Sequence, residues 1–247
     1  MTPGDLDRRP TIVFLHGTRL TGAQWAVELV RLADEFHCIA LDLPGHGVAA
    51  DIPFTVDVAA ARVAALIADE GHGGRAILVG LSLGGFVAMA VAGRWPDRVS
   101  GLVVSGASGE PSGVRSVGYR LLGAAFQYLP LGILDRANRW YFAHRYPAVA
   151  AEPLLAGGFW FRGGAMAIRS LIGEPFRPRL AAYPGPTLLV NGEFDLWFRP
   201  TERSFADVAV DGRRVVIRRA THLVNLDQPE AFTAVIRRFA GEVTRGR

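Results

Sequence analysis

The stretch AILVGLSLGGFVAMAVAGR, residues 76–94, joins a short apolar strand pattern to a longer apolar helix pattern through a turn of the form Gly-x-Ser-x-Gly. In such a strand–turn–helix unit the central serine takes a strained backbone conformation that lifts its hydroxyl out of the sheet. Side chains at Gly80 and Gly84 would collide with neighbouring backbone. The stretch therefore predicts a reactive Ser82, provided that a base and an acid lie nearby.

On both sides of this turn, short apolar runs alternate with longer helical patterns. The strand patterns cover 11–15, 37–41, 76–81, 99–105, 187–191 and 214–219, and the helical patterns cover about 24–35, 55–70, 83–94, 201–208 and 229–240. This alternation predicts an α/β fold with a doubly wound, mostly parallel sheet that has helices on both faces. Thr55 is expected to cap the second helix.

The alternation is interrupted once, between the fourth and fifth strand patterns. Residues 107–180 contain no strand-like run and are helix-prone and rich in aromatic residues. Glycine pairs and prolines mark turns within this segment. We therefore expect a core made of 1–106 and 181–247, with 107–180 inserted as a helical cap or lid.

A serine hydroxyl needs a base, and a histidine base needs a carboxylate to orient it. Asp195 follows the fifth strand pattern and His222 follows the sixth. Since the carboxyl ends of parallel strands meet at one edge of a sheet, both should converge on Ser82. Glu110, which follows the fourth strand pattern, is a competing acid, but the segment NGEFD favours Asp195.

These features resemble the α/β-hydrolase superfamily, in particular its esterase-like and lipase-like branch with a serine nucleophile and a helical cap. The resemblance extends from Thr11 to about Phe239. Besides the three residues above, it includes His16-Gly17, DLPGHG at 42–47 and the segment THLVNLDQPEAF at 221–232. It implies that Ser82, Asp195 and His222 form a catalytic triad and that no cofactor or metal is needed.

The resemblance also implies an oxyanion hole made of the backbone N–H groups of Thr18 and Leu83. Such donors meet negative charge that develops in the transition state. The expected reaction is hydrolysis of a small, largely apolar carboxylic ester, lactone or thioester through an acyl-enzyme on Ser82. His16 and His46 belong to motifs of this family, and the resemblance implies that they hold loops in place by hydrogen bonds.

Three departures from the family pattern are visible. Only ten residues precede the first strand pattern, too few for the two strands that usually open the fold, so we expect six strands. Thr221 stands where the family often has glycine. Ser82 stands where related dehalogenases and epoxide hydrolases use aspartate, which disfavours their chemistry here.

Candidate pocket residues are less well defined by the sequence. An inserted cap should face the catalytic edge of the sheet, so aromatic residues there could line an apolar pocket. The candidates are Trp25, Trp140, Phe159, Trp160, Trp197 and Phe198, although aromatic residues at helical spacing more often belong to a core. Arg19 could meet a substrate carboxylate or be a solvated loop charge.

Composition excludes several other classes. All 27 cationic side chains are arginine, the formal net charge is only +4, and the arginines are scattered, which disfavours nucleic-acid binding. Cys38 is the single cysteine, so neither a disulfide nor a cysteine zinc cluster is expected. No apolar run is long enough to span a membrane, and the N-terminus lacks a signal-peptide core. We expect a cytoplasmic monomer or homodimer that acts on a small molecule.

The same triad is compatible with other functions. C–C bond hydrolases, cofactorless perhydrolases and lyases resemble this pattern, and non-catalytic ligand receptors of this fold can keep an intact triad. Substrate identity depends on cap packing, which has no readable motif.

Overall fold

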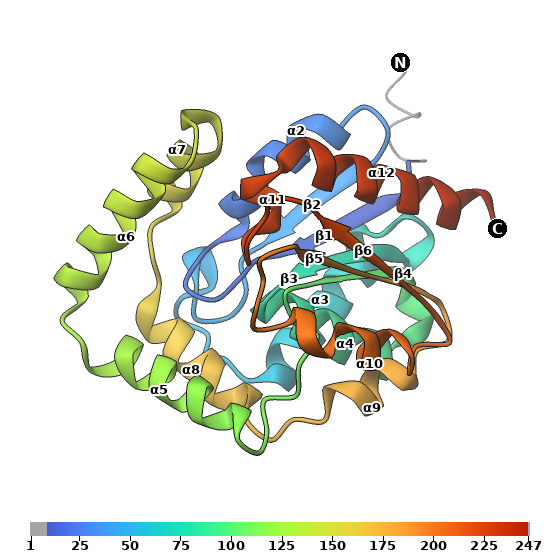
Figure 1. The fold of residues 1–247 in the computed structure, drawn as a ribbon. Helices are drawn as coiled ribbons and strands as arrows, with labels where there is room; N and C mark the ends of the chain where they lie inside the picture. The colour runs from blue at the N-terminus through green and yellow to red at the C-terminus, as the bar shows by residue number, and fades with distance from the viewer. Residues whose placement is uncertain (1–8, 247) are drawn as a thin grey trace.

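The computed structural model describes residues 9–246. The prediction that the N-terminus lacks a signal peptide concerns residues 1–8, which lie outside this range. Six strands form one sheet in the order β2-β1-β3-β4-β5-β6, and every pairing is parallel (Figure 1). The strands are β1 (Thr11–Leu15), β2 (His37–Leu41), β3 (Ala76–Leu81), β4 (Val99–Ser105), β5 (Pro186–Gly192) and β6 (Asp211–Ile217). The predicted doubly wound sheet of six strands is confirmed.

The described helices follow the predicted alternation. They are α2 (Ala26–Leu32), α3 (Val56–Glu70), α4 (Leu83–Arg94), α5 (Arg115–Tyr128), α6 (Leu131–Arg145), α7 (Ala148–Gly157), α8 (Phe161–Leu171), α9 (Phe176–Ala181), α10 (Glu202–Ala206), α11 (Val224–Asp227) and α12 (Pro229–Arg245), with short 3-10 turns η1 (Gly22–Trp25), η2 (Gly47–Ala49), η3 (His72–Gly74), η4 (Pro96–Arg98) and η5 (Arg199–Thr201). The hydroxyl of Thr55 caps α3 by accepting from the Val58 N–H, as expected. Among the described residues, no helix combines the length and the apolar character that a bilayer crossing requires.

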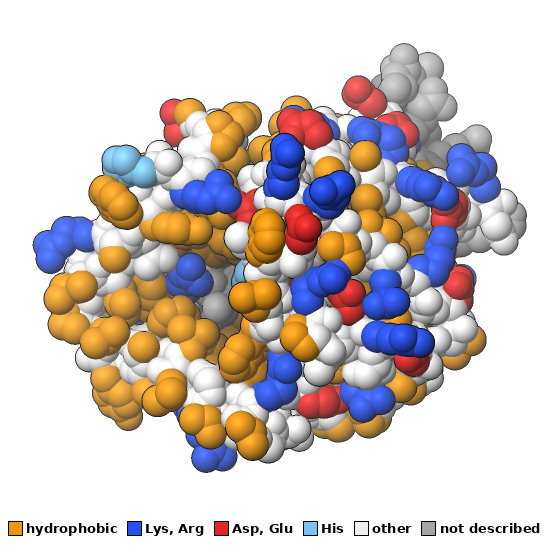
Figure 2. Space-filling model, in the orientation of Figure 1, with side chains coloured by type: hydrophobic (Ala, Val, Ile, Leu, Met, Phe, Trp, Pro, Cys, Tyr) orange, Lys and Arg blue, Asp and Glu red, His pale blue; other side chains and the backbone are white. Residues whose placement is uncertain are grey.

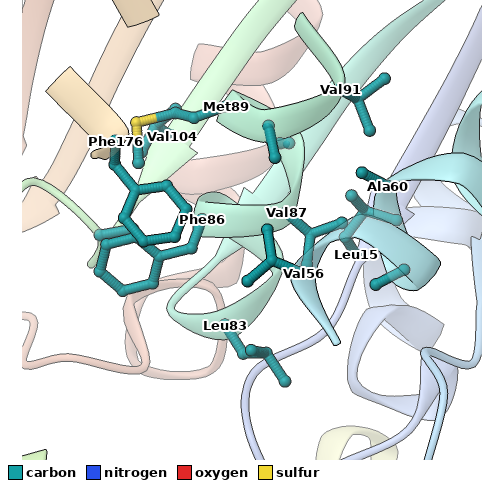
Figure 3. Close-up of a cluster of buried hydrophobic side chains, with 14 of the residues drawn as sticks. Leu15, Val56, Ala60, Leu83, Phe86, Val87, Met89, Val91, Val104 and Phe176 are labelled. Carbon is teal, nitrogen blue, oxygen red and sulfur yellow. The ribbon is translucent and has the colours of Figure 1, made fainter. Parts of the chain in front are cut away.

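Side chains that alternate along each strand fill two separate core layers. In β1, Val13 and Leu15 face the layer that contains α3 and α4, whereas Ile12 and Phe14 face the layer that contains α12. Figure 3 shows the first layer, in which side chains of α4 lie between those of α3 and the ring of Phe176. Both faces of the sheet are therefore buried, as its continuous apolar strands predict.

Helices α5 to α8 lie between β4 and β5 in the chain and stand to one side of the sheet (Figure 1). The following helix, α9, belongs to the core layer instead. Its Phe176 ring lies 4.6 Å from the ring of Phe86 in α4, centroid to centroid, and a Cβ on Gly93 would meet the Arg179 carbonyl oxygen at 2.6 Å. The cap boundary at 107–180 remains a prediction.

Candidate active site

Ser82 sits in a strained turn between β3 and α4. Its φ of 54° and ψ of −115° place it in a backbone region that residues with a Cβ rarely adopt, and its N–H is held by the Ser105 carbonyl oxygen at 2.8 Å. A Cβ on Gly84 would lie 2.0 Å from the Leu15 carbonyl oxygen, and one on Gly80 would lie 2.3 Å from the Gly84 carbonyl oxygen. The two glycines thus let α4 begin directly against the sheet and fix the serine.

Asp195 and His222 are joined by a hydrogen bond. The distance from His222 Nδ1 to Asp195 Oδ2 is 2.9 Å, and only 3% of the Asp195 side chain is exposed. The second carboxylate oxygen accepts from the Phe198 N–H at 3.3 Å. With Nδ1–H donated to the carboxylate, Nε2 of the imidazole is left as a proton acceptor.

The imidazole of His222 is fixed on two sides. The ring of Phe198 stacks on it at 5.4 Å between centroids, and a Cβ on Gly106 would lie 2.6 Å from His222 Cε1. The backbone N–H and the hydroxyl of Thr221 both donate to Asp227 Oδ2, so the threonine that replaces the usual glycine ties down the histidine loop.

One cavity of about 360 Å³ brings the predicted residues together. Ser82, Asp195 and His222 line it, and so do Thr18 and Leu83. Leu83 is the first residue of α4, so its N–H has no partner within the helix and, like the other N–H groups of the first turn, faces the N-terminal end of the helix. The cavity lies at the carboxyl edge of the parallel strands, where ligand sites of such sheets occur. Figure 2 shows the molecule hollowed between the cap helices and the core, with hydrophobic side chains around the hollow.

Two buried histidines hold the loop that contains Thr18. His16 donates from Nδ1 to the Gly17 carbonyl oxygen and accepts at Nε2 from the Leu43 N–H, while His46 Nε2 accepts from the Arg19 N–H at 3.2 Å. Burial, reinforced by the neighbouring His46, lowers the pKa of His16 to about 3, and burial also lowers the pKa of His46. Both are therefore neutral hydrogen-bonding groups at neutral pH.

A polar network behind this loop was missed from the sequence. The Gly17 N–H donates to Gln24 Oε1 at 2.8 Å, and Gln24 Nε2 donates to Asn225 Oδ1 at 3.3 Å, which links the loop to the helix after His222. Glu28 lies fully buried beside this network, and burial raises its pKa to about 8. The only signal in the sequence was a glutamine and a glutamate four residues apart within an apolar helical pattern.

The competing acid Glu110 has another role in the fold. Its carboxylate accepts from the N–H groups of Phe176 and Arg177 and so caps the start of α9. Within residues 9–246, no group of three or more histidine, cysteine, aspartate or glutamate side chains is placed to hold a metal ion.

The model of the family described as "Alpha/beta hydrolase family" matches residues 12–235. The chain belongs to the α/β-hydrolase family. It is 30% identical to a pimeloyl-[acyl-carrier protein] methyl ester esterase of Edwardsiella ictaluri, over 93% of this chain and 92% of that protein. It is also 30% identical to a 2-succinyl-6-hydroxy-2,4-cyclohexadiene-1-carboxylate synthase of Serratia proteamaculans, over 96% and 94% of the two chains.

A solved structure of a thermophilic esterase from Thermogutta terrifontis superimposes on this α/β hydrolase with a TM-score of 0.80. The two sequences are 28% identical, and the superposition covers 95% of this chain and 90% of the other. The similarity therefore extends over the cap as well as the core.

Three of the predicted pocket residues of this α/β hydrolase line the cavity, namely Arg19, Trp197 and Phe198. Trp25 does not, because its fully buried ring packs between Phe14 and Phe232 in the core.

The cap aromatics also lie elsewhere. Trp140 is 65% exposed on α6 and stacks on His144. Phe159 and Trp160 line a second cavity, of about 510 Å³, that contains none of the triad residues.

Residues outside the set of predicted pocket candidates complete this cavity. They are Phe86, Gly118, Tyr119, Leu122, Ile168 and Leu171. Most come from α5 and α8, which contact each other and form the wall opposite the sheet. Their aliphatic and aromatic character makes the cavity largely apolar.

Proposed function

We propose that this α/β hydrolase is a cofactor-independent serine hydrolase that cleaves small, largely apolar carboxylic esters, lactones or thioesters. The observation that carries the proposal is the strained Ser82, which opens onto the same apolar cavity as the hydrogen-bonded pair His222–Asp195. A nucleophile, an oriented base and a buried orienting carboxylate are the parts that acyl transfer needs.

In the proposed mechanism, His222 Nε2 removes the hydroxyl proton of Ser82 as Oγ attacks the substrate carbonyl carbon. Asp195 keeps Nδ1 protonated and stabilises the imidazolium that forms. The N–H groups of Thr18 and Leu83 donate to the oxyanion of the tetrahedral intermediate. The imidazolium then protonates the leaving group, and water, activated by the same histidine, cleaves the acyl-enzyme.

Relatives that are named as esterases support ester cleavage. A curated relative at 30% identity is named as a methyl ester esterase, and a structural neighbour at 28% identity is described as an esterase. The catalytic cavity, of about 360 Å³, suits a substrate of modest size with an apolar body.

The test is turnover of p-nitrophenyl butyrate by the wild type and by Ser82→Ala. We expect the substitution to reduce kcat by about 10³-fold or more, because without the nucleophile only the oxyanion donors and binding remain. Ser112→Ala, which removes an exposed serine outside the cavity, is the matched control. Equal rates for wild type and Ser82→Ala would refute the nucleophile assignment.

A lyase reaction on the same triad is the second candidate, favoured by the similarity to the named synthase. In that case Ser82, deprotonated by His222, would act as a base rather than form an acyl-enzyme. A fluorophosphonate adduct on Ser82 without turnover of any ester would favour the lyase, whereas turnover of esters favours the hydrolase.

A further inference from the structure

Arg19 is a cation in the wall of the catalytic cavity without a counter-ion. It follows the proposed oxyanion donor Thr18 and lines the cavity together with Ser82 and His222. Within residues 9–246 no carboxylate lies within ion-pair distance of its guanidinium. Asp195, the one acidic residue of the cavity wall, is occupied by His222.

Several other arginines of this chain, unlike Arg19, are paired with a carboxylate. Arg145 bonds to the buried Asp227 at 2.6 Å, and Arg179 bonds to Glu174. Moving a guanidinium out of water without an anion is costly, so an unpaired one in a largely apolar cavity leaves that site unsatisfied.

The backbone of Arg19 is fixed in place. Its φ of 59° is unusual for a residue with a Cβ. Its N–H donates to His46 at 3.2 Å, and its carbonyl oxygen accepts from the Trp160 N–H at 2.8 Å. The strained loop is thus held from the core by His46 and from the cap by Trp160.

The guanidinium is oriented as well. Nε donates to Asn138 Oδ1 at 2.8 Å, and Asn138 is itself held by a bond from Nδ2 to the Leu134 carbonyl oxygen. The central carbon of the guanidinium lies 5.8 Å from the centroid of the Phe126 ring. The two Nη groups have no partner among the described residues, so their N–H bonds remain available to a ligand.

Burial lowers the pKa of Arg19 to about 10, so the group still carries its positive charge at neutral pH. A guanidinium has the planar geometry that binds a carboxylate through two parallel hydrogen bonds. The single charge also matches one carboxylate better than a doubly charged phosphate.

We propose that Arg19 binds a carboxylate of the substrate, so that the preferred substrate is a small ester or lactone with an apolar body and one free carboxylate. This inference rests on the proposed hydrolase function and names its substrate class. Because Thr18 and Arg19 are adjacent, the distance between the bound carboxylate and the oxyanion donor would be no more than about the length of one arginine side chain. Binding of the carboxylate would therefore determine which carbonyl group of the substrate reaches Ser82.

The test compares esters that differ only in charge. Monomethyl adipate and methyl hexanoate carry the difference on the acyl side, and butyryloxyacetate and ethyl butyrate carry it on the alcohol side. The readout is the ratio of kcat/KM for the anionic ester to that for the neutral ester within each pair.

We expect the wild type to favour the anionic ester in at least one pair, and the pair concerned identifies the side that carries the carboxylate. Arg19→Gln should lower that ratio by about 10- to 100-fold, as expected for lost hydrogen bonds to a charged group, and Arg19→Lys should lower it less. Arg120→Gln removes an exposed charge from α5 outside the cavity and should keep the wild-type ratio. No preference in either pair, or an unchanged ratio in Arg19→Gln, would overturn the proposal.

A binding measurement separates this inference from the proposed reaction. In calorimetry with Ser82→Ala, monomethyl adipate or butyryloxyacetate should bind more tightly than its neutral partner, and the added Arg19→Gln should abolish the difference. That result would support the carboxylate site even if the wild type hydrolyses no ester, whereas equal binding of charged and neutral esters would refute it.

Discussion

At Asp195 the carboxylate is almost completely buried and both oxygens are engaged, one by His222 and one by the Phe198 N–H. This arrangement fixes the tautomer of the imidazole as well as its position. A neutral side chain of the same shape would keep the position but not the tautomer, because an amide can donate where the carboxylate only accepts.

We therefore predict that Asp195→Asn reduces kcat for p-nitrophenyl butyrate by about 10⁴-fold while the protein stays folded. Glu110→Gln is the control, since that carboxylate caps α9 outside the cavity. The measurement is steady-state kinetics with circular dichroism on both variants. A larger loss in Glu110→Gln than in Asp195→Asn would reassign the acid.

Sequence alone predicted the residues whose chemistry depends on chain order and turn geometry. Ser82, Asp195 and His222 each follow a strand, so the parallel sheet dictates that they meet. Trp25 and Trp140 could not be placed in this way. Helical spacing predicts which residues share one face of a helix, but not what that face packs against. The structure buries Trp25 against Phe14 and leaves Trp140 exposed.

Helix α4 begins against β1 and β3 with no room for a side chain at Gly84. A Cβ there would lie 2.0 Å from the carbonyl oxygen of Leu15, and backbone on both sides cannot move without displacing Ser82. The close contact between strand and helix therefore requires glycine here, and so does the position of Ser82, the proposed nucleophile.

We predict that Gly84→Ala lowers the free energy of unfolding by about 1–3 kcal/mol, because the added methyl group overpacks the contact between α4 and β1. The same substitution should also reduce kcat. Gly132→Ala in α6 is the matched control, because a Cβ there meets nothing within 4 Å and alanine favours a helix. Urea unfolding and ester turnover measure the two effects. Equal stability of the two variants would contradict the close contact.

The boundaries of a strand are harder to predict from the sequence where its residues are exposed and polar. The apolar pattern indicated a strand over 214–219, yet β6 spans Asp211–Ile217. It is an edge strand, and its first four residues are exposed, so they show no hydrophobic signal although they pair with β5. Within 107–180, the sequence predicted helical structure. It did not predict that α5 and α8 contact each other and line the cavity, because that depends on tertiary packing.

The stability of the whole molecule should respond to pH through Glu28. Its carboxyl has a pKa of about 8 in the folded protein against an ordinary value of 4.5, because burial disfavours the charged form. Between these two pH values the folded state keeps a proton that the unfolded state has lost. Stability therefore falls as pH rises, by up to about 1.4 kcal/mol per pH unit from this group.

Glu28→Gln removes this penalty while keeping a similar shape, so we predict a variant that is more stable than the wild type at neutral pH. The difference should shrink as the pH approaches about 4.5. Urea unfolding across this range tests it, with the exposed Glu70→Gln as control. The same pH slope in wild type and Glu28→Gln would show that Glu28 is not the group responsible.

At the scale of the molecule, the fold brings the proposed nucleophile Ser82 and the proposed base His222 to one apolar cavity from segments more than a hundred residues apart. The central claim is that Ser82 carries the acyl group. Intact-mass analysis of enzyme quenched in acid during turnover of p-nitrophenyl butyrate, followed by peptide mapping, tests it most directly. We predict a mass increase of one butyryl group that maps to Ser82 and is absent in Ser82→Ala. An adduct on another residue, or the same adduct in Ser82→Ala, would contradict the claim.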